Sequence, residues 1–189
     1  MLRKEIRTIV KKMRGTVSRE FFDYAHERLS DLVERGGFTL EEFGVDAEEL
    51  RTLRRHACLT TALFWRTRLL KGVPEQYDNY IEYLHNELAE GGYTLTDPDV
   101  GSSEEEIALC RVRGRELTAK KYLREMRLTF AQHGYVYSRD LTHFREEVTD
   151  EMHPLSLKRL GTTADEVEKF SSVKIRGSRG HESACMSAA

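Results

Sequence analysis

The sequence predicts an all-α fold of six or seven helices, arranged as two and a half repeated helical hairpins. Apolar residues recur at helical spacing, only three prolines interrupt the 189 residues, and one helix-start signal occurs three times. We expect a single helical domain over residues 1–170, with repeat units at about 18–72, 75–130 and 138–170. Residues 171–189 are rich in Ser and Gly and poor in large apolar side chains, so we expect a disordered tail there.

The helix-start signal combines an apolar residue, a glycine corner and a capping box. In a capping box, a Ser, Thr or Asp side chain accepts a hydrogen bond from a free amide of the first turn, and a Glu three residues later turns back toward the cap. The three signals contain Gly44-Val45-Asp46-x-x-Glu49, Gly101-Ser102-Ser103-x-x-Glu106 and Gly161-Thr162-Thr163-x-x-Glu166. The first and second glycines are 57 residues apart and the second and third are 60 apart, a period typical of helical-hairpin repeats.

The first part of the chain contains three predicted helices. Residues 2–13 place apolar residues at helical spacing between Lys and Arg, which predicts a short basic amphipathic helix that ends before Gly15. Ser18 caps the next helix, which ends at Gly36-Gly37 because glycine readily adopts the left-handed conformation of a helix C-terminus. The third helix, at about 46–71, is apolar on nearly every side in its middle, so we expect it to be the most buried.

The rest of the chain contains four more predicted helices, at about 75–90, 104–130, 138–152 and 164–170. Gly91-Gly92 ends the first of them, and Gly134 separates the second from the third. His153-Pro154 stops the third, because the residue before a proline disfavours helical geometry. We find no alternating apolar and polar pattern of the kind that predicts β-strands.

Composition excludes several classes of protein. The three cysteines, Cys58, Cys110 and Cys185, are widely spaced and odd in number, so a disulfide framework and a CxxC metal or redox site are not expected. No apolar run resembles a signal peptide or approaches the roughly 20 residues of a membrane span. We therefore expect a cytoplasmic protein that does not enter a membrane.

Charge is segregated along the chain although the net charge is only −2. Residues 72–110 contain ten Asp or Glu and no Lys or Arg, whereas residues 50–74 and 111–127 are rich in basic residues. Two interpretations are open. The opposite charges select the correct pairing of neighbouring helices, each surface pair contributing about 0–1 kcal/mol, or they form a surface that docks a charged partner.

We expect a non-enzymatic adaptor or regulatory protein that binds another protein through a charged and aromatic helical surface. The sequence contains none of the nucleophile, phosphate-binding or metalloprotease motifs that identify common enzymes, and it implies no cofactor. The candidate partner-binding residues are the basic residues flanking the acidic segment and two tyrosines at helical spacing: Arg54, Arg55, Arg66, Arg68, Arg113, Lys120, Lys121, Arg124, Tyr77 and Tyr80.

Two alternative functions are considered. The basic helices 2–14, 50–71 and 111–127 suggest a nucleic-acid-binding regulator, although a pI near 6.4 lacks the usual basic signature. A small metal-dependent helical enzyme is the third hypothesis, because a carboxylate precedes a histidine by three residues within three of the predicted helices, as in di-iron helical bundles. These pairs are Asp23/His26, Glu82/His85 and Asp140/His143. About one such pair is expected by chance at this ordinary helical spacing, so we predict no metal site.

Overall fold

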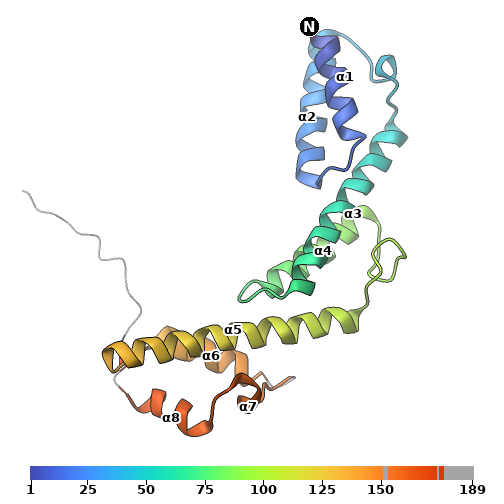
Figure 1. Ribbon diagram of the computed structural model, residues 1–189. Helices are drawn as coiled ribbons and strands as arrows, with labels where there is room; N and C mark the ends of the chain where they lie inside the picture. The colour runs from blue at the N-terminus through green and yellow to red at the C-terminus, as the bar shows by residue number, and fades with distance from the viewer. Residues whose placement is uncertain (151–152, 174, 177–189) are drawn as a thin grey trace, which may run out of the picture. The chain divides into compact units, whose positions relative to one another are not determined.

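The computed structural model describes residues 1–150, 153–173 and 175–176, and these residues are predominantly helical (Figure 1). The elements in chain order are α1 (Leu2–Met13), α2 (Arg19–Gly36), the 3-10 helix η1 (Glu41–Phe43), α3 (Ala47–Lys71), α4 (Tyr77–Gly91), α5 (Glu104–His133), β1 (Val136–Tyr137), α6 (Ser138–Val148), α7 (Leu157–Leu160), α8 (Ala164–Ser172) and β2 (Ile175–Arg176). The prediction of an all-α fold is confirmed, although the described residues form eight α-helices and not the six or seven predicted.

The chain divides into two compact units. Unit 1 contains Met1–Lys71 and Gln76–Arg111, and unit 2 contains Gly72–Glu75 and Val112–Ala189. Helix α5 contributes residues to both units. The prediction of one helical domain over residues 1–170, and of two and a half repeated hairpins within it, stays a prediction.

The helices predicted at about 2–13, 18–35, 46–71, 75–90, 104–130 and 164–170 correspond to α1, α2, α3, α4, α5 and α8. The helix predicted over 138–152 is shorter in the structure, where α6 ends at Val148. There the chain turns: the Leu155 amide donates to the Val148 carbonyl at 3.2 Å. The buried Arg115 side chain also donates to the His153 carbonyl at 2.8 Å and to the Glu147 carbonyl.

Two further expectations are corrected in unit 2. The described residues include a short parallel ladder, which joins Val136 to Ile175 and Tyr137 to Arg176, where no strand was predicted. Helix α8 extends to Ser172, so residues 171–172 and 175–176 belong to regular structure and not to the predicted tail. The remaining tail residues, 174 and 177–189, lie outside the described part of the chain, as does Cys185.

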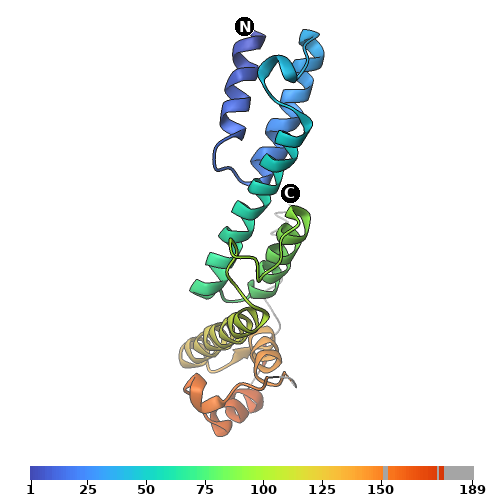
Figure 2. The same ribbon diagram turned by 90° about the vertical axis from the view of Figure 1, so that its right-hand side faces the viewer.

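Unit 1 has two hydrophobic clusters. Helix α1 packs on α2 through Ile6, Val10 and Met13, which join Phe22 and Leu29 in the first cluster. The second cluster lies between α3 and α4, which run side by side in Figures 1 and 2. Its members include Leu59, Ala62, Leu69, Leu84 and Leu88. Helices α3 and α4 together therefore form a rigid base for any surface that they share.

Among the described residues of unit 2, one hydrophobic cluster joins α5, α6 and α8. Tyr122, Leu123 and Met126 of α5 pack with Phe144 of α6 and Phe170 of α8, and all five are at most 5% exposed. Burial of a large apolar side chain contributes about 1.5–3 kcal/mol, so these contacts are the main stabilising force within the unit.

The predicted caps are confirmed at all three corners. Each cap side chain accepts from the backbone amide of the Glu three residues later: Asp46 from Glu49 at 2.7 Å, Ser103 from Glu106 at 3.2 Å and Thr163 from Glu166 at 3.2 Å. The corner glycines have φ values of +67°, +59° and +74° at Gly44, Gly101 and Gly161, in the left-handed region that other residues disfavour.

The capping Glu side chains make a different contact from the expected one. Each accepts from an arginine that also donates to the carbonyl of the corner glycine, an arrangement we call an arginine clamp. The clamps are Arg14 to Gly44 (2.7 Å) and Glu49 (2.6 Å), Arg66 to Gly101 (2.8 Å) and Glu106 (3.2 Å), and Arg127 to Gly161 (2.8 Å) and Glu166 (2.7 Å). One guanidinium thus bonds both to the glycine corner and to the first turn of the helix that follows it.

Candidate protein-binding surface

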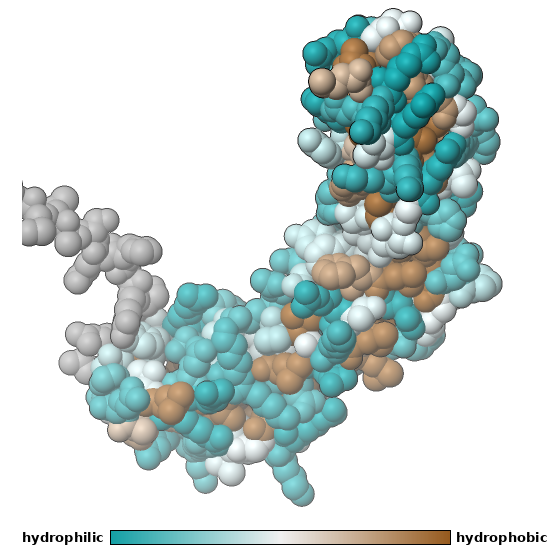
Figure 3. All heavy atoms as spheres, turned by 45° about the horizontal axis from the view of Figure 1, so that its top comes forward, coloured by the Kyte–Doolittle hydropathy of each residue, from teal (hydrophilic) through white to brown (hydrophobic). Residues whose placement is uncertain are grey.

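An aromatic cluster lies on the surface of unit 1 where α3 meets α4. Phe64 and Trp65 come from α3, and Tyr80 and Tyr83 come from α4. The ring centroid of Trp65 is 4.9 Å from that of Phe64, 5.0 Å from that of Tyr80 and 5.1 Å from that of Tyr83. Phe64 is 48% exposed and Tyr83 is 44% exposed, so the cluster presents aromatic surface to solvent. Figure 3 shows patches of hydrophobic residues among hydrophilic ones on the face of the molecule that it draws.

Helix geometry explains which of these rings reach the surface. Tyr77, Tyr80 and Tyr83 are three residues apart, and an α-helix turns by about 300° over three residues, so successive tyrosines rotate around the helix. Tyr77 is only 8% exposed and lies in the core, whereas Tyr80 is half-buried and Tyr83 is exposed. The predicted partner-binding role of Tyr77 is therefore corrected, because its side chain packs inside unit 1.

Beside the aromatic cluster lies a groove of about 650 Å³. We call it the acidic–aromatic groove; its lining residues come from α2, α3 and α4 and are Arg19, Glu20, Trp65, Tyr83, Asn86, Glu87, Ala89 and Glu90. Its lining combines two aromatic side chains with three carboxylates and one guanidinium.

An ion pair between α2 and α4 forms part of the groove lining. The Arg19 Nε donates to both Glu87 carboxylate oxygens, at 2.8 and 2.9 Å, and Glu87 is only 5% exposed. Burial raises the pKa of Glu87 above its ordinary value, although the hydrogen bond from Arg19 acts in the opposite direction. The same hydrogen bond is the main cause of the raised pKa of Arg19. Removing one partner would leave a buried charge unpaired, so the pair holds this part of the groove in place.

The other two groove carboxylates are more exposed. Glu90 is contacted by Arg54 at 2.8 Å and by Arg19 at 3.6 Å. Glu20 is exposed at the start of α2 and makes no hydrogen bond or ion pair within the described part of the chain. The described charged side chains in and beside the groove comprise two cations and four acids, so their net charge is about −2. The cations are Arg19 and Arg54, and the acids are Glu20, Asp23, Glu87 and Glu90.

The predicted basic residues of unit 1 bond within the unit. Arg54 contacts Glu90 and also Asp23, at 3.4 Å. Arg55 donates to the Gly91 carbonyl at 3.0 Å, and Arg66 belongs to an arginine clamp. The guanidinium of Arg68 lies 5.1 Å from the centroid of the Phe64 ring, beside the aromatic cluster. These contacts agree with the interpretation that the segregated charges pair neighbouring helices.

Most of the predicted basic residues of unit 2 have contacts within their own unit. Lys120 contacts Glu116 at 2.6 Å, and Lys121 contacts Glu75 at 2.5 Å. Arg113 lies next to Gly72, and Arg124 is exposed on α5. Because most of the predicted cations already have internal partners, the nucleic-acid alternative gains no support from their geometry.

The three carboxylate–histidine pairs lie on separate helices. Asp23 contacts Arg19 and Arg54, and the His143 ring stacks on Tyr122 with centroids 5.1 Å apart. Burial raises the pKa of Asp140 above its ordinary value, although nearby cationic side chains act in the opposite direction. Within residues 1–150, 153–173 and 175–176 no three His, Cys, Asp or Glu side chains are grouped to hold a metal ion.

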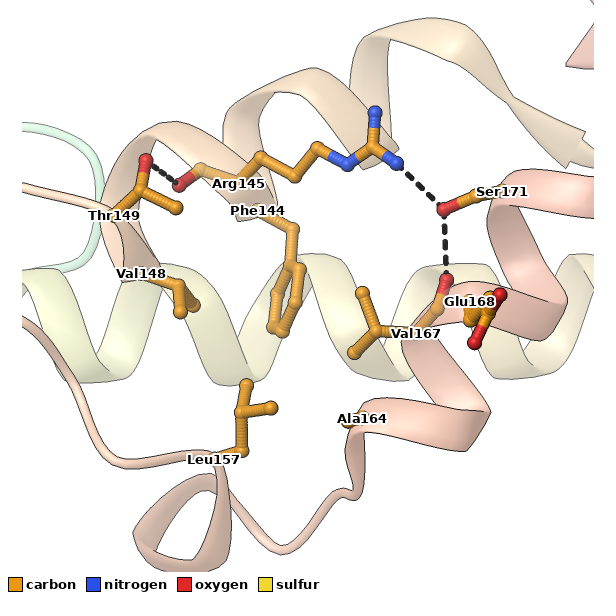
Figure 4. Close-up of a pocket in the computed structure, with 9 residues that line it drawn as sticks. All are labelled: Phe144, Arg145, Val148, Thr149, Leu157, Ala164, Val167, Glu168 and Ser171. Atoms are coloured by element: carbon orange, nitrogen blue, oxygen red, sulfur yellow. Dashed lines mark hydrogen bonds between the residues drawn. The ribbon is translucent and has the colours of Figure 1, made fainter.

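Unit 2 has a hollow of its own between α6 and α8, of about 440 Å³ (Figure 4). Phe144, Val148 and Val167 give it a mainly apolar lining. Arg145 crosses one side and donates to the Ser171 hydroxyl at 2.6 Å, and Ser171 in turn donates to the Val167 carbonyl at 2.9 Å. Exposed aromatic rings lie in and beside the unit 1 groove, and aromatic residues are enriched at protein interfaces, so that groove is the stronger candidate site.

None of the eight residues that line the groove is among the partner-binding residues predicted from the sequence. Arg19, Glu20, Asn86 and Glu87 were not candidate residues, because nothing local in the sequence shows that the start of α2 lies against α4. One signal was present: the acid-rich segment 72–110 carries the groove carboxylates of α4.

No helix among the described residues is long and apolar enough to span a membrane. Comparison of the chain with models of protein families, with curated proteins and with solved structures finds no match.

Proposed function

We propose that this protein is a non-enzymatic adaptor or regulatory protein that binds another protein through the aromatic cluster and the acidic–aromatic groove of unit 1. The observation that supports this function most strongly is the exposure of Phe64 and Tyr83 next to the half-buried Trp65. Aromatic side chains are enriched at the energetically dominant positions of protein interfaces, because they bury a large area at a small cost in conformational entropy.

The support under the cluster fits the same function. Helices α3 and α4 pack closely, and the Arg19–Glu87 pair ties α2 to α4 beside the rings. A surface that is already rigid loses less entropy when a partner binds.

The test is a comparison of two double variants in affinity capture. Phe64→Ser with Tyr83→Ser removes the exposed rings, and Leu109→Ser with Leu128→Ser removes apolar side chains of similar or greater exposure, 70% and 49%, from α5. Tagged full-length proteins are incubated with extract of the source cells, and captured proteins are quantified by mass spectrometry. We expect at least one protein to be captured by the wild type and the α5 variant, and about tenfold less by the aromatic variant.

Two controls make the result decisive. Circular dichroism and thermal melting must show that both variants keep the wild-type helix content. Nuclease treatment of the extract must leave the capture intact, because loss of the signal would favour the nucleic-acid alternative. Capture that is equal for the aromatic variant and the wild type would contradict the proposed function.

A further inference from the structure

We infer that the acidic–aromatic groove receives an arginine side chain of the partner protein. This inference rests on the proposed function and specifies the chemistry of the partner. Two features of the groove lead to it, its charge and the aromatic side chains that line it. Arginine–ring contacts elsewhere in unit 1 add a third argument.

The charge around the groove favours a cation. Arg19 is engaged by the buried Glu87, and Arg54 is engaged by Asp23 and Glu90. Glu20 stays exposed, with no hydrogen bond or ion pair among the residues described. A positively charged side chain that enters the groove therefore gains a carboxylate partner without displacing an existing ion pair, and complementary charge also speeds the encounter.

The rings of Trp65 and Tyr83 favour arginine over other cations. Both side chains line the groove, with their centroids 5.1 Å apart and their planes tilted by 45°. A guanidinium is planar and weakly hydrated, so it stacks on an aromatic face while its N–H groups still donate to a carboxylate in two parallel hydrogen bonds. The ammonium of lysine is compact and strongly hydrated, and it lacks this planar fork.

The protein already uses this chemistry internally. The guanidinium of Arg68 lies 5.1 Å from the Phe64 ring centroid within the same aromatic cluster, and that of Arg55 lies 5.3 Å from the Tyr93 ring centroid. Arg3 repeats the arrangement 4.4 Å from the ring centroid of Phe38. An arginine of the partner protein would make with Trp65 and Tyr83 the same kind of contact that these three arginines make with rings within unit 1.

Trp65 makes the inference directly measurable, because it is the only tryptophan of the chain. The probes are two acetylated and amidated peptides of sequence Ala-Leu-X-Leu-Ala, in which X is arginine or citrulline. Citrulline has nearly the same shape as arginine but carries no charge. Each peptide is titrated into the full-length protein, and the fluorescence of Trp65 is followed at low and at moderate salt.

We expect the arginine peptide to change Trp65 fluorescence saturably, with a dissociation constant about tenfold lower than that of the citrulline peptide. Added salt should reduce the difference, because screening weakens interactions with the exposed Glu20 carboxylate. The variant Glu20→Gln should lose most of the preference for arginine. Its matched control, Glu34→Gln, changes an exposed acid of the same helix about 20 Å away and should retain the preference.

Equal affinity for the two peptides, or a preference that survives Glu20→Gln, would overturn the inference. Failure of the inference is distinguishable from failure of the proposed function. If capture of a cellular protein depends on Phe64 and Tyr83 but is unchanged by Glu20→Gln, the proposed function stands and the arginine contact is wrong. If capture does not depend on Phe64 and Tyr83, the proposal that this surface binds the partner is wrong.

Discussion

The arginine clamp of unit 2 provides a direct test of how the corners are stabilised. Glu166 accepts from Arg127 Nε at 2.8 Å, from Arg127 Nη2 at 2.7 Å and from the Thr162 hydroxyl at 2.7 Å. The substitution Glu166→Gln keeps the shape of the side chain and one acceptor oxygen, but it removes the charge and one of the two parallel hydrogen bonds from Arg127. We expect it to lower the free energy of unfolding of the protein.

The magnitude follows from the pKa of this carboxyl group. The hydrogen bond from Arg127 is the main cause that lowers the pKa of Glu166 from 4.5 to about 2. Each pKa unit corresponds to about 1.4 kcal/mol, so the full shift sets an upper bound of about 3 kcal/mol. Glu166 is 29% exposed and Arg127 is 43% exposed, and solvent screens their interaction. We therefore expect a loss of about 1–2 kcal/mol at pH 7.

The assay is urea unfolding of wild type and Glu166→Gln, followed by circular dichroism at pH 7 and at a series of lower pH values. The folded-state pKa of Glu166 lies below its unfolded value, so its stabilising contribution is complete above about pH 5 and disappears as the pH falls toward 2. The difference between the two proteins should accordingly shrink over this pH range. Glu168→Gln is the matched control, because Glu168 is exposed on the same helix and makes no ion pair within the described residues.

Two results would refute this reasoning. A difference in stability that is the same at pH 7 and pH 2.5 would show that the charge of Glu166 is not responsible for it. A loss of similar size in Glu168→Gln would show that any acid on α8 has the same effect through the helix dipole, without the clamp.

Two further predictions concern the stability of unit 1. Asp46→Ala should lower the free energy of unfolding by about 0.5–2 kcal/mol in urea titrations, because the Asp46 side chain caps the first turn of α3; an unchanged midpoint would contradict that role. Gly91→Ala should destabilise by about 1–3 kcal/mol, because an added Cβ would lie 2.8 Å from the Tyr93 ring and 3.0 Å from the Cys58 Cβ. The control Gly15→Ala places its Cβ 3.2 Å from a single carbonyl oxygen, and a loss at Gly15 as large as at Gly91 would contradict the overpacking argument.

The sequence by itself determined where most helices begin and end. Ser18, Asp46, Ser103 and Thr163 cap the helices that they were predicted to cap. The corner and helix-end glycines have the positive φ values that their positions require, Gly37 among them. These signals are reliable because capping and left-handed glycines depend on residues within one turn of each other.

The end of α6 shows where local signals stop being sufficient. The sequence predicted a helix up to the residues before Pro154, but α6 ends at Val148. The carbonyls of this turn, those of Glu147 and His153, accept from Arg115, which lies more than 30 residues earlier on α5. A contact over that distance in sequence leaves no local pattern near residue 148.

Only the tertiary structure decided which charges and rings meet. The sequence separated acidic from basic segments, yet it did not show that Arg19 pairs with Glu87 or that Arg66 holds the corner at Gly101. It also placed Tyr77 and Tyr80 together as surface candidates, whereas packing buries the first beneath the surface. The physical reason is that helical periodicity defines the faces of each helix, but the partner of a side chain depends on which helix lies opposite and at what height, and distant parts of the chain set both.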